Sequence, residues 1–153
     1  LWALRFLVIG LAISPLRRIG GPNLVRYRRT VGLLAFFYAL FHVIVYVVLD
    51  QGLDVAAIVA DIVKRPYITV GMAAFLILLP LAVTSNASMI RRLGGAAWQK
   101  LHRWVYLAAV LAALHFIMLL KTVTFEAAFY AAMIAALLLF RLVDRRRVNR
   151  LRR

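Results

Sequence analysis

Residues 98–118 constrain the fold of this chain more than any other stretch. They open with aromatic and basic side chains and continue as a long apolar run that carries His115 near its far end. A helix of about 20 apolar residues is what crosses a hydrocarbon core about 30 Å thick, so this stretch predicts a membrane span. Ionisable side chains are rare in such helices and are usually functional. His102, at the opening edge, and His115 are therefore candidate functional residues.

Composition narrows the class of protein further. The chain is 65% hydrophobic, which predicts that lipid surrounds most of it. A net charge of +15 would suit a nucleic-acid partner, but the chain has no solvated polar domain to present such a surface. The lack of cysteine excludes disulfides, thiolate-ligated haem, c-type haem and cysteine-held iron–sulfur clusters. Histidine is the obvious remaining metal ligand, and the chain has three: His42, His102 and His115.

The apolar pattern predicts an all-α integral membrane bundle that forms one domain over residues 1–153. We expect five spans, at residues 1–14, 31–49, 67–84, 98–120 and 126–142. The first of these is short for a span, and the chain starts at Leu1 without a methionine. We therefore expect that a segment precedes Leu1 in the full-length protein.

The segments between the spans have their own signals. Residues 50–65 show helical apolar spacing with acidic residues among it, which predicts a short helix on the membrane surface. Pro66 suits the first turn of the next helix, and Pro80 should kink that helix near its end. We expect a loop over residues 85–103, a short turn at 121–125 and a basic tail at 145–153.

The histidines differ in depth. His42 lies 13 residues beyond Arg29 and His115 lies 12 beyond Arg103 on spans that run in the same direction, which puts both about 18–20 Å from the inner edge of the membrane. Two histidines at equal depth on separate helices suit a haem held between the helices by two imidazoles. In the alternative interpretation, each is a buried histidine bonded to a neighbouring helix.

His102 lies about 20 Å from His115 along an ideal helix, so the two cannot bind the same ion. It marks a candidate second cofactor or metal site at the cytoplasmic edge. An ordinary interfacial histidine is the equally weighted alternative.

Several motifs spread over about residues 15–120 resemble the ferric-reductase-like membrane domains. Within them, the chain is similar to the haem-binding subunits of bacterial periplasmic methionine sulfoxide reductase systems. The matching segments include Phe37-Tyr38-x-x-x-His42-x-x-x-Tyr46, Lys64-Arg65-Pro66-Tyr67-Ile68-Thr69-x-Gly71 and Leu93-Gly94-x-x-x-Trp98-x-x-Leu101-His102-Arg103 with His115.

The resemblance implies six spans in the full-length protein, one more than the five counted here. It implies b-type haem, with flavin mononucleotide (FMN) as an associated cofactor. It also implies electrons taken from the quinone pool or a cytoplasmic flavin reductase. They would pass to a periplasmic molybdenum-containing catalytic subunit that repairs oxidised methionine. Related two-haem reductases carry two histidines on each of two helices, whereas the helix with His42 has Arg28 and Arg29 where a second histidine would stand.

These observations favour a transmembrane electron conduit with no substrate chemistry of its own. A ferric-reductase- or NADPH-oxidase-like haem reductase is the alternative from the same family. A transporter or membrane anchor is the alternative from another class, although a transporter would be expected to show intramembrane acids or paired broken helices.

The distribution of charge predicts the orientation of the chain in the bacterial inner membrane. Sixteen of its 20 basic residues flank or occupy residues 19–30, 85–103 and the C-terminal tail, and such segments stay in the cytoplasm. A reporter that is active only in the periplasm, fused after Arg153, should therefore be silent. Activity of that fusion would contradict the predicted orientation, and it would also contradict the placement of His42 and His115 in the outer half of the membrane.

Overall fold

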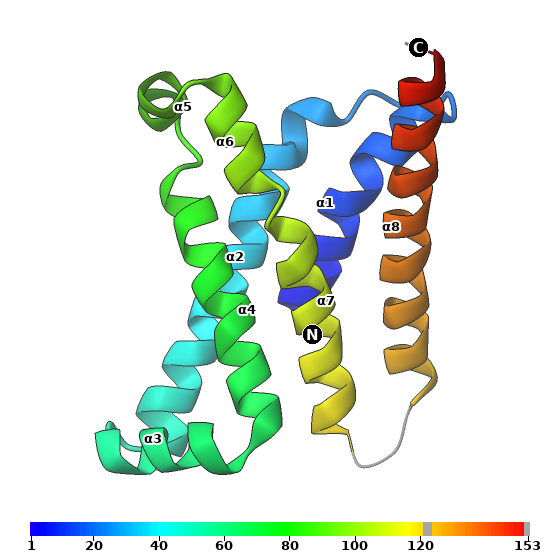
Figure 1. Cartoon of the computed structure of the whole chain (residues 1–153). Coiled ribbons are helices and arrows are strands. Elements are labelled where there is room, and N and C mark those ends of the chain that lie inside the picture. Colours follow the sequence, from blue (N-terminus) through cyan, green and yellow to red (C-terminus); the bar gives the residue numbers. More distant parts are fainter. Residues whose placement is uncertain (121–123, 152–153) are drawn as a thin grey trace.

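The computed structural model describes residues 1–120 and 124–151, with side chains as far as residue 144. The described chain is helical, without a strand, and its long helices run side by side (Figure 1). Its elements are α1 (Trp2–Arg18), η1 (Val25–Tyr27), α2 (Arg28–Val45), η2 (Tyr46–Asp50), α3 (Val55–Lys64), α4 (Pro66–Val83), α5 (Ala87–Leu93), α6 (Gly95–His102), α7 (Val105–Leu119) and α8 (Phe125–Leu151).

Four segments are long and apolar enough to cross a membrane: Val25–Asp50, Pro66–Val83, Gly95–Leu119 and Phe125–Asp144. The predicted all-α, multi-pass membrane protein is confirmed. The sequence predicted five spans. The fifth, at the start of the chain, corresponds to α1, whose 17 residues make it shorter than these four segments. The expected turn at 121–125 lies largely outside the described residues.

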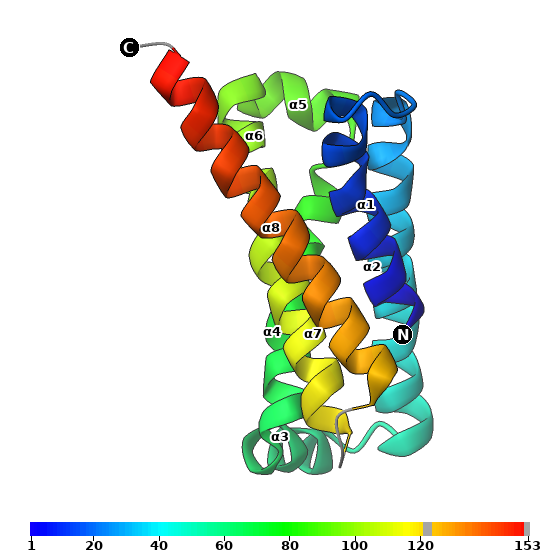
Figure 2. The ribbon, with the colours of Figure 1, turned by 90° about the vertical axis from the view of Figure 1, so that its right-hand side faces the viewer.

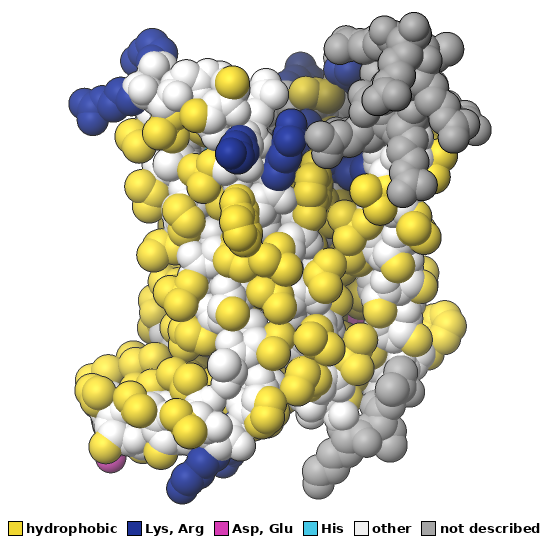
Figure 3. Space-filling view, in the orientation of Figure 1, with side chains coloured by type: hydrophobic (Ala, Val, Ile, Leu, Met, Phe, Trp, Pro, Cys, Tyr) yellow, Lys and Arg dark blue, Asp and Glu magenta, His cyan; other side chains and the backbone are white. Residues whose placement is uncertain are grey.

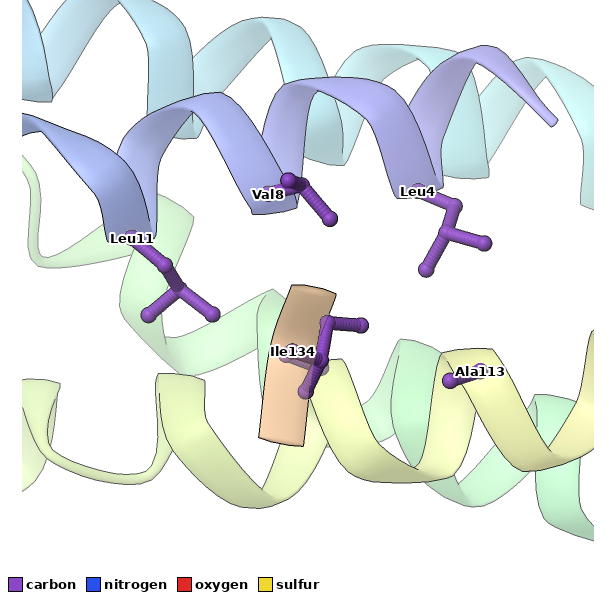
Figure 4. Close-up of a cluster of buried hydrophobic side chains, with 6 residues drawn as sticks. Leu4, Val8, Leu11, Ala113 and Ile134 are labelled. Carbon is purple, nitrogen blue, oxygen red and sulfur yellow. The ribbon is translucent and has the colours of Figure 1, made fainter. Parts of the chain in front are cut away.

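Two apolar clusters hold α1, α2, α4, α7 and α8 together. One cluster lies where α1 meets α7 and α8, and Figure 4 shows its side chains converging; it contains Leu4, Val8, Leu11, Ala109, Ala113 and Ile134. The other contains Leu7, Ala35, Phe36, Leu78 and Ala108. Small side chains let helix backbones approach closely, as they do in membrane bundles generally.

A proline in α1 explains an unusual contact with α8. Pro15 lacks an N–H group, so the Leu11 carbonyl one turn earlier loses its usual helical donor. The guanidinium of Arg141 takes that place, with Nη2 donating to the Leu11 carbonyl at 2.7 Å and Nη1 donating to the Tyr106 hydroxyl at 2.6 Å. One side chain of α8 therefore joins α1 and α7.

Ion pairs join α1 to α8 on either side of that contact. Arg5 binds Glu126 at 3.0 Å and also donates to the Tyr130 hydroxyl at 2.9 Å. Near the other end of α1, Arg18 pairs with Asp144. Because the partners advance together along both helices, α1 and α8 run in the same direction.

The expected loop over residues 85–103 is wrong, because two short helices occupy it. The Asn86 side chain accepts a hydrogen bond from the Met89 N–H and begins α5, and Gly94, at φ 76°, separates α5 from α6. The span predicted at residues 98–120 is matched by Gly95–Leu119, within which α6 ends at His102 and α7 begins at Val105.

The predicted helix in residues 50–65 and the helix start at Pro66 are confirmed by α3 and α4. Helix α4 continues for three residues beyond Pro80. Helix α8 extends from the last span into the basic tail. Figures 1 and 2 place α3 across one end of the bundle and α5 and α6 at the other, on the same side as the C-terminus.

The side chains divide along the length of the molecule. In Figure 3, most of the visible Lys and Arg side chains gather at the end with α5 and α6, and hydrophobic side chains cover the flank between the two ends. This arrangement places the cationic segments around residues 17–29 and 91–103 together at one end of the bundle. It matches the charge asymmetry from which the orientation was predicted.

The contact between Arg141 and Leu11 predicts a measurable coupling. Arg141→Leu leaves the Leu11 carbonyl without a donor, and Pro15→Ala supplies a helical N–H in its place. We expect Pro15→Ala to stabilise the Arg141→Leu background by about 1 kcal/mol more than it stabilises the unaltered chain. The free energy of unfolding in mixed micelles, measured for all four proteins, gives this coupling. Additive effects of the two substitutions would contradict the assignment.

Candidate functional site

The imidazole rings of His42 on α2 and His115 on α7 lie close together in an edge-to-face arrangement. His42 is on α2, one turn before its end, and His115 is in the last turns of α7. The ring centroids lie 6.3 Å apart and the ring planes are inclined by 62°. The structure thus brings together the two histidines that the sequence placed at equal depth.

Helix α4 fixes the orientation of the His115 ring. The Nδ1 atom of His115 lies 2.7 Å from the backbone carbonyl oxygen of Tyr67. A carbonyl oxygen can only accept a hydrogen bond, so Nδ1 must carry the proton and donate it. The neutral ring then keeps the lone pair of Nε2 for another partner. Metal-binding histidines commonly show this arrangement, with the second ring nitrogen donating to a carbonyl or carboxylate.

Gly71 makes this contact possible. A Cβ atom at this position would lie 2.6 Å from Nδ1 and 2.9 Å from Cε1 of His115, closer than non-bonded atoms approach. Glycine therefore allows the imidazole to lie directly against the backbone of α4. The Tyr67 carbonyl and the bare Gly71 backbone, one turn apart, together form the surface on which His115 rests.

The corner between α3 and α4 holds Tyr67 from the other side. Arg65 Nη1 donates to the Tyr67 hydroxyl at 3.1 Å, and Arg65 Nε lies 3.2 Å from the Asp61 carboxylate. The Tyr67 hydroxyl and then the negative Asp61 carboxylate raise the pKa of Arg65 above its ordinary value. Asp61 also accepts hydrogen bonds from Gln51 at 3.0 Å and from the Tyr46 hydroxyl at 3.4 Å. This network links the segment after His42 to the start of α4.

The helix carrying His42 changes its winding four residues after His42. Residues Tyr46–Asp50 form a π-helical turn, a local widening that is often found at functional sites. The His42 side chain is exposed on the protein surface, whereas His115 is half-buried against α4. An exposed imidazole in the middle of an apolar segment is unusual for a membrane span.

His102 belongs to a separate site at the other end of α4. Its Nε2 lies 3.1 Å from the hydroxyl of buried Thr84, and its ring stacks on Trp98 with centroids 3.8 Å apart. Trp98 Nε1 in turn donates to the Thr84 carbonyl at 2.9 Å. Because Tyr67 and Thr84 are 17 residues apart on or just beyond α4, the two sites are separated by about 25 Å.

Sequence reasoning singled out the three histidines as candidates but did not identify the residues that contact them. Tyr67 and Gly71 appeared only as parts of a motif, and Thr84 and Trp98 were not connected with His102. A glycine within an apolar span is a signal of close helix contact, and it would have pointed to Gly71. Among the described residues, no group of three or more His, Cys, Asp or Glu side chains is placed to hold a metal ion. The pair formed by His42 and His115 is therefore the candidate metal-binding feature in this part of the chain.

Comparison with known families agrees with the motifs around these sites. The model of the ferric reductase like transmembrane component matches residues 1–113, which is most of the chain. The chain belongs to this family. The match includes His42 and His102 and ends two residues before His115, so it covers most of both sites. No solved structure matches the chain.

Curated relatives narrow the similarity within the family. The chain is 54% identical, over 142 residues, to the protein-methionine-sulfoxide reductase heme-binding subunits MsrQ of Brucella ovis, Brucella canis and Brucella suis. Each match covers 93% of this chain and 64% of the relative, so the chain spans less than two thirds of the length of these relatives. The resemblance inferred from the sequence motifs is confirmed.

The contact between Gly71 and His115 predicts a position-specific effect of one methyl group. Gly71→Ala should displace the His115 ring from the Tyr67 carbonyl and lower the free energy of unfolding by about 1–3 kcal/mol. Gly32→Ala is the matched control, since Gly32 is also in a span and a Cβ there meets nothing within 4 Å. The free energy of unfolding in micelles is measured for both variants. Equal stability of the two would show that the close approach at Gly71 is not required.

Proposed function

We propose that His42 and His115 are the two axial ligands of one b-type haem, and that the chain carries electrons across the membrane. The distance between the two imidazole rings is the observation that carries this proposal. The family, and the relatives named as heme-binding subunits, support the choice of cofactor.

The ring separation distinguishes a shared metal from a direct hydrogen bond. A five-membered ring with bonds of about 1.33 Å has a radius of about 1.1 Å. Two imidazoles on opposite sides of one metal ion, each about 2.0–2.1 Å from it, have centroids about 6.2–6.4 Å apart. Two imidazoles joined by a hydrogen bond of about 2.9 Å would have centroids about 5.1 Å apart. The observed 6.3 Å is longer than a direct hydrogen bond gives, and it supports the proposal that the two rings would hold one metal ion between them.

Two further observations support a bound group at this place. The Tyr67 carbonyl selects the tautomer of His115 whose Nε2 is free to bind a metal. The imidazole of His42 is exposed in a segment that should cross the membrane. Binding a metal would give this polar group a partner that lipid does not offer.

Each part of the site has a role in this proposal. A bound haem supplies one-electron redox chemistry through its iron. Helix α4 orients His115 and covers one side of its ring, through the Tyr67 carbonyl and Gly71. The network of Asp61 with Tyr46 and Gln51 supports the end of α2 beyond His42.

The wider function follows from the relatives and from the charge of the two ends. We propose that the chain belongs to the bacterial inner membrane with its C-terminus in the cytoplasm. Electrons would come from the quinone pool or a cytoplasmic flavin reductase, with FMN as an associated cofactor. They would pass to a periplasmic molybdenum-containing methionine sulfoxide reductase subunit. The chain would have no substrate chemistry of its own.

Helix α1 would be a fifth span in this arrangement, with a sixth helix upstream in the full-length protein. Its 17 residues are joined to α8 by the Arg5–Glu126 and Arg18–Asp144 pairs, one toward each end of α1. This supports a position along α8 through the same layer of the membrane.

His102 would serve electron entry or a second cofactor at the cytoplasmic end. The separation of about 25 Å between the two sites along α4 supports two distinct positions. A structural role, in which His102 fastens α6 to Thr84, is the alternative.

The family name also favours a second candidate, the reduction of ferric iron. The two functions differ in the electron acceptor. Reduced, haem-loaded chain should be reoxidised by the methionine sulfoxide reductase subunit faster than by chelated ferric iron. The opposite order would favour the ferric reductase.

The haem proposal is tested by removing the ligands one at a time. We expect His42→Ala and His115→Ala each to abolish the same low-spin haem signal, and the double variant to lose no more than either one. Haem content and low-spin electron paramagnetic resonance lines measure this. His102→Ala is the matched control, and it should keep that signal while slowing reduction from the cytoplasmic side.

Two outcomes would contradict the assignment. Loss of different signals in His42→Ala and His115→Ala would show that they do not share one haem. Complete loss of haem in folded His102→Ala would show that the two sites are not independent.

A further inference from the structure

One face of α2 carries a hollow that the electron-transfer site does not use. It has a volume of about 490 Å³ and is lined by residues of η1 and the first three turns of α2: Arg26, Arg29, Thr30, Leu33, Leu34 and Phe37. The hollow is open along one side, and all of its lining residues lie on η1 and one face of α2. The hollow begins at the cationic end of the bundle and continues along the span toward the middle of the membrane.

The lining is divided by chemistry along the helix axis. The two guanidinium groups and the Thr30 hydroxyl belong to the end near the surface, and the three apolar side chains lie deeper. Arg29 and Phe37 are eight residues apart, which is about 12 Å along the helix. Phe37 is 57% exposed, so the deep end presents a large apolar surface.

Within residues 1–120 and 124–144, no acidic side chain pairs with the cationic end of the hollow. The ion pairs among the described residues engage Arg5, Arg18 and Arg65, and neither Arg26 nor Arg29 forms one. The guanidinium of Arg26 lies 4.7 Å from the centre of the Tyr27 ring, which holds it near the helix start. The helical segment that runs from η1 into α2 begins at this end, so its N-terminal dipole adds to the positive potential of the two guanidinium groups.

We propose that this hollow binds one anionic phospholipid from the cytoplasmic leaflet. The headgroup phosphate contacts Arg26, Arg29 and the Thr30 hydroxyl. An acyl chain lies over Leu33, Leu34 and Phe37. Anionic lipids give this leaflet its negative surface potential, whereas the ammonium group of a zwitterionic headgroup is repelled by the two guanidinium groups.

A bound lipid must be distinguished from the general attraction between anionic lipid and a basic surface. Arg91 and Arg92 on α5 offer that comparison, because they are exposed at the same end of the molecule but do not line the hollow. Replacing both Arg26 and Arg29, or both Arg91 and Arg92, lowers the net charge by the same amount. Only the replacement of Arg26 and Arg29 should weaken binding at a specific site.

The test is native mass spectrometry of the full chain released from micelles containing phosphatidylglycerol or phosphatidylcholine with identical acyl chains. We expect phosphatidylglycerol to be retained in a 1:1 complex. Arg26→Gln with Arg29→Gln should weaken its apparent affinity about 25-fold, or about fivefold for each arginine. Arg91→Gln with Arg92→Gln should weaken it less than about threefold.

The apolar half of the hollow has its own test, which also covers a failure of the arginine double variant to fold. Phe37→Ala should weaken retention of phosphatidylglycerol, and Phe41→Ala should not, although Phe41 is also exposed on α2 at 65%. The proposal would be overturned if the two arginine double variants, or the two phenylalanine variants, lost phosphatidylglycerol equally. It would also be overturned if phosphatidylcholine were retained as well as phosphatidylglycerol, or if glycerol phosphate without acyl chains bound as tightly.

Discussion

A polar group inside a bilayer has no water to bind, and the cross-helix contacts of this molecule follow from that constraint. The Leu11 carbonyl, released by Pro15, accepts from Arg141 on α8. The Tyr67 carbonyl accepts from His115 on α7. Each of these hydrogen bonds joins two helices at one level along the bundle axis. The bonds that pair the polar groups therefore also determine how far one helix is displaced along its neighbour. The apolar clusters then fill the space between.

Helix α4 supports both candidate sites. Its first turns orient His115, and the residue directly after its last turn, Thr84, contacts both His102 and Trp98. A single rigid element about 25 Å long therefore determines the distance between the two histidine sites. In the proposed electron carrier, this distance separates the place where electrons enter from the place where they leave.

Charge organises the two ends in different ways. At the end with α3, the acid Asp61 is shared among Arg65, Gln51 and Tyr46, which forms a closed network beside the histidine pair. At the opposite end, basic residues outnumber acids, and Asp144 is paired with Arg18. Arg26 and Arg29 are thereby left to interact with lipid. The first arrangement suits a rigid site, and the second suits anchoring to an anionic leaflet.

The sequence by itself determined the class of protein, the approximate positions of the long helices and the matched depth of His42 and His115. These properties depend on the length of apolar runs and on counting residues from a charged boundary, and both are local. The tertiary structure alone decided which side of each helix faces which neighbour. Helices α4 and α7 carry apolar side chains on nearly every face, so hydrophobic periodicity does not indicate their rotation. Gly71 and His115 are 44 residues apart, and they meet only because the two helices pack at one rotation and one height.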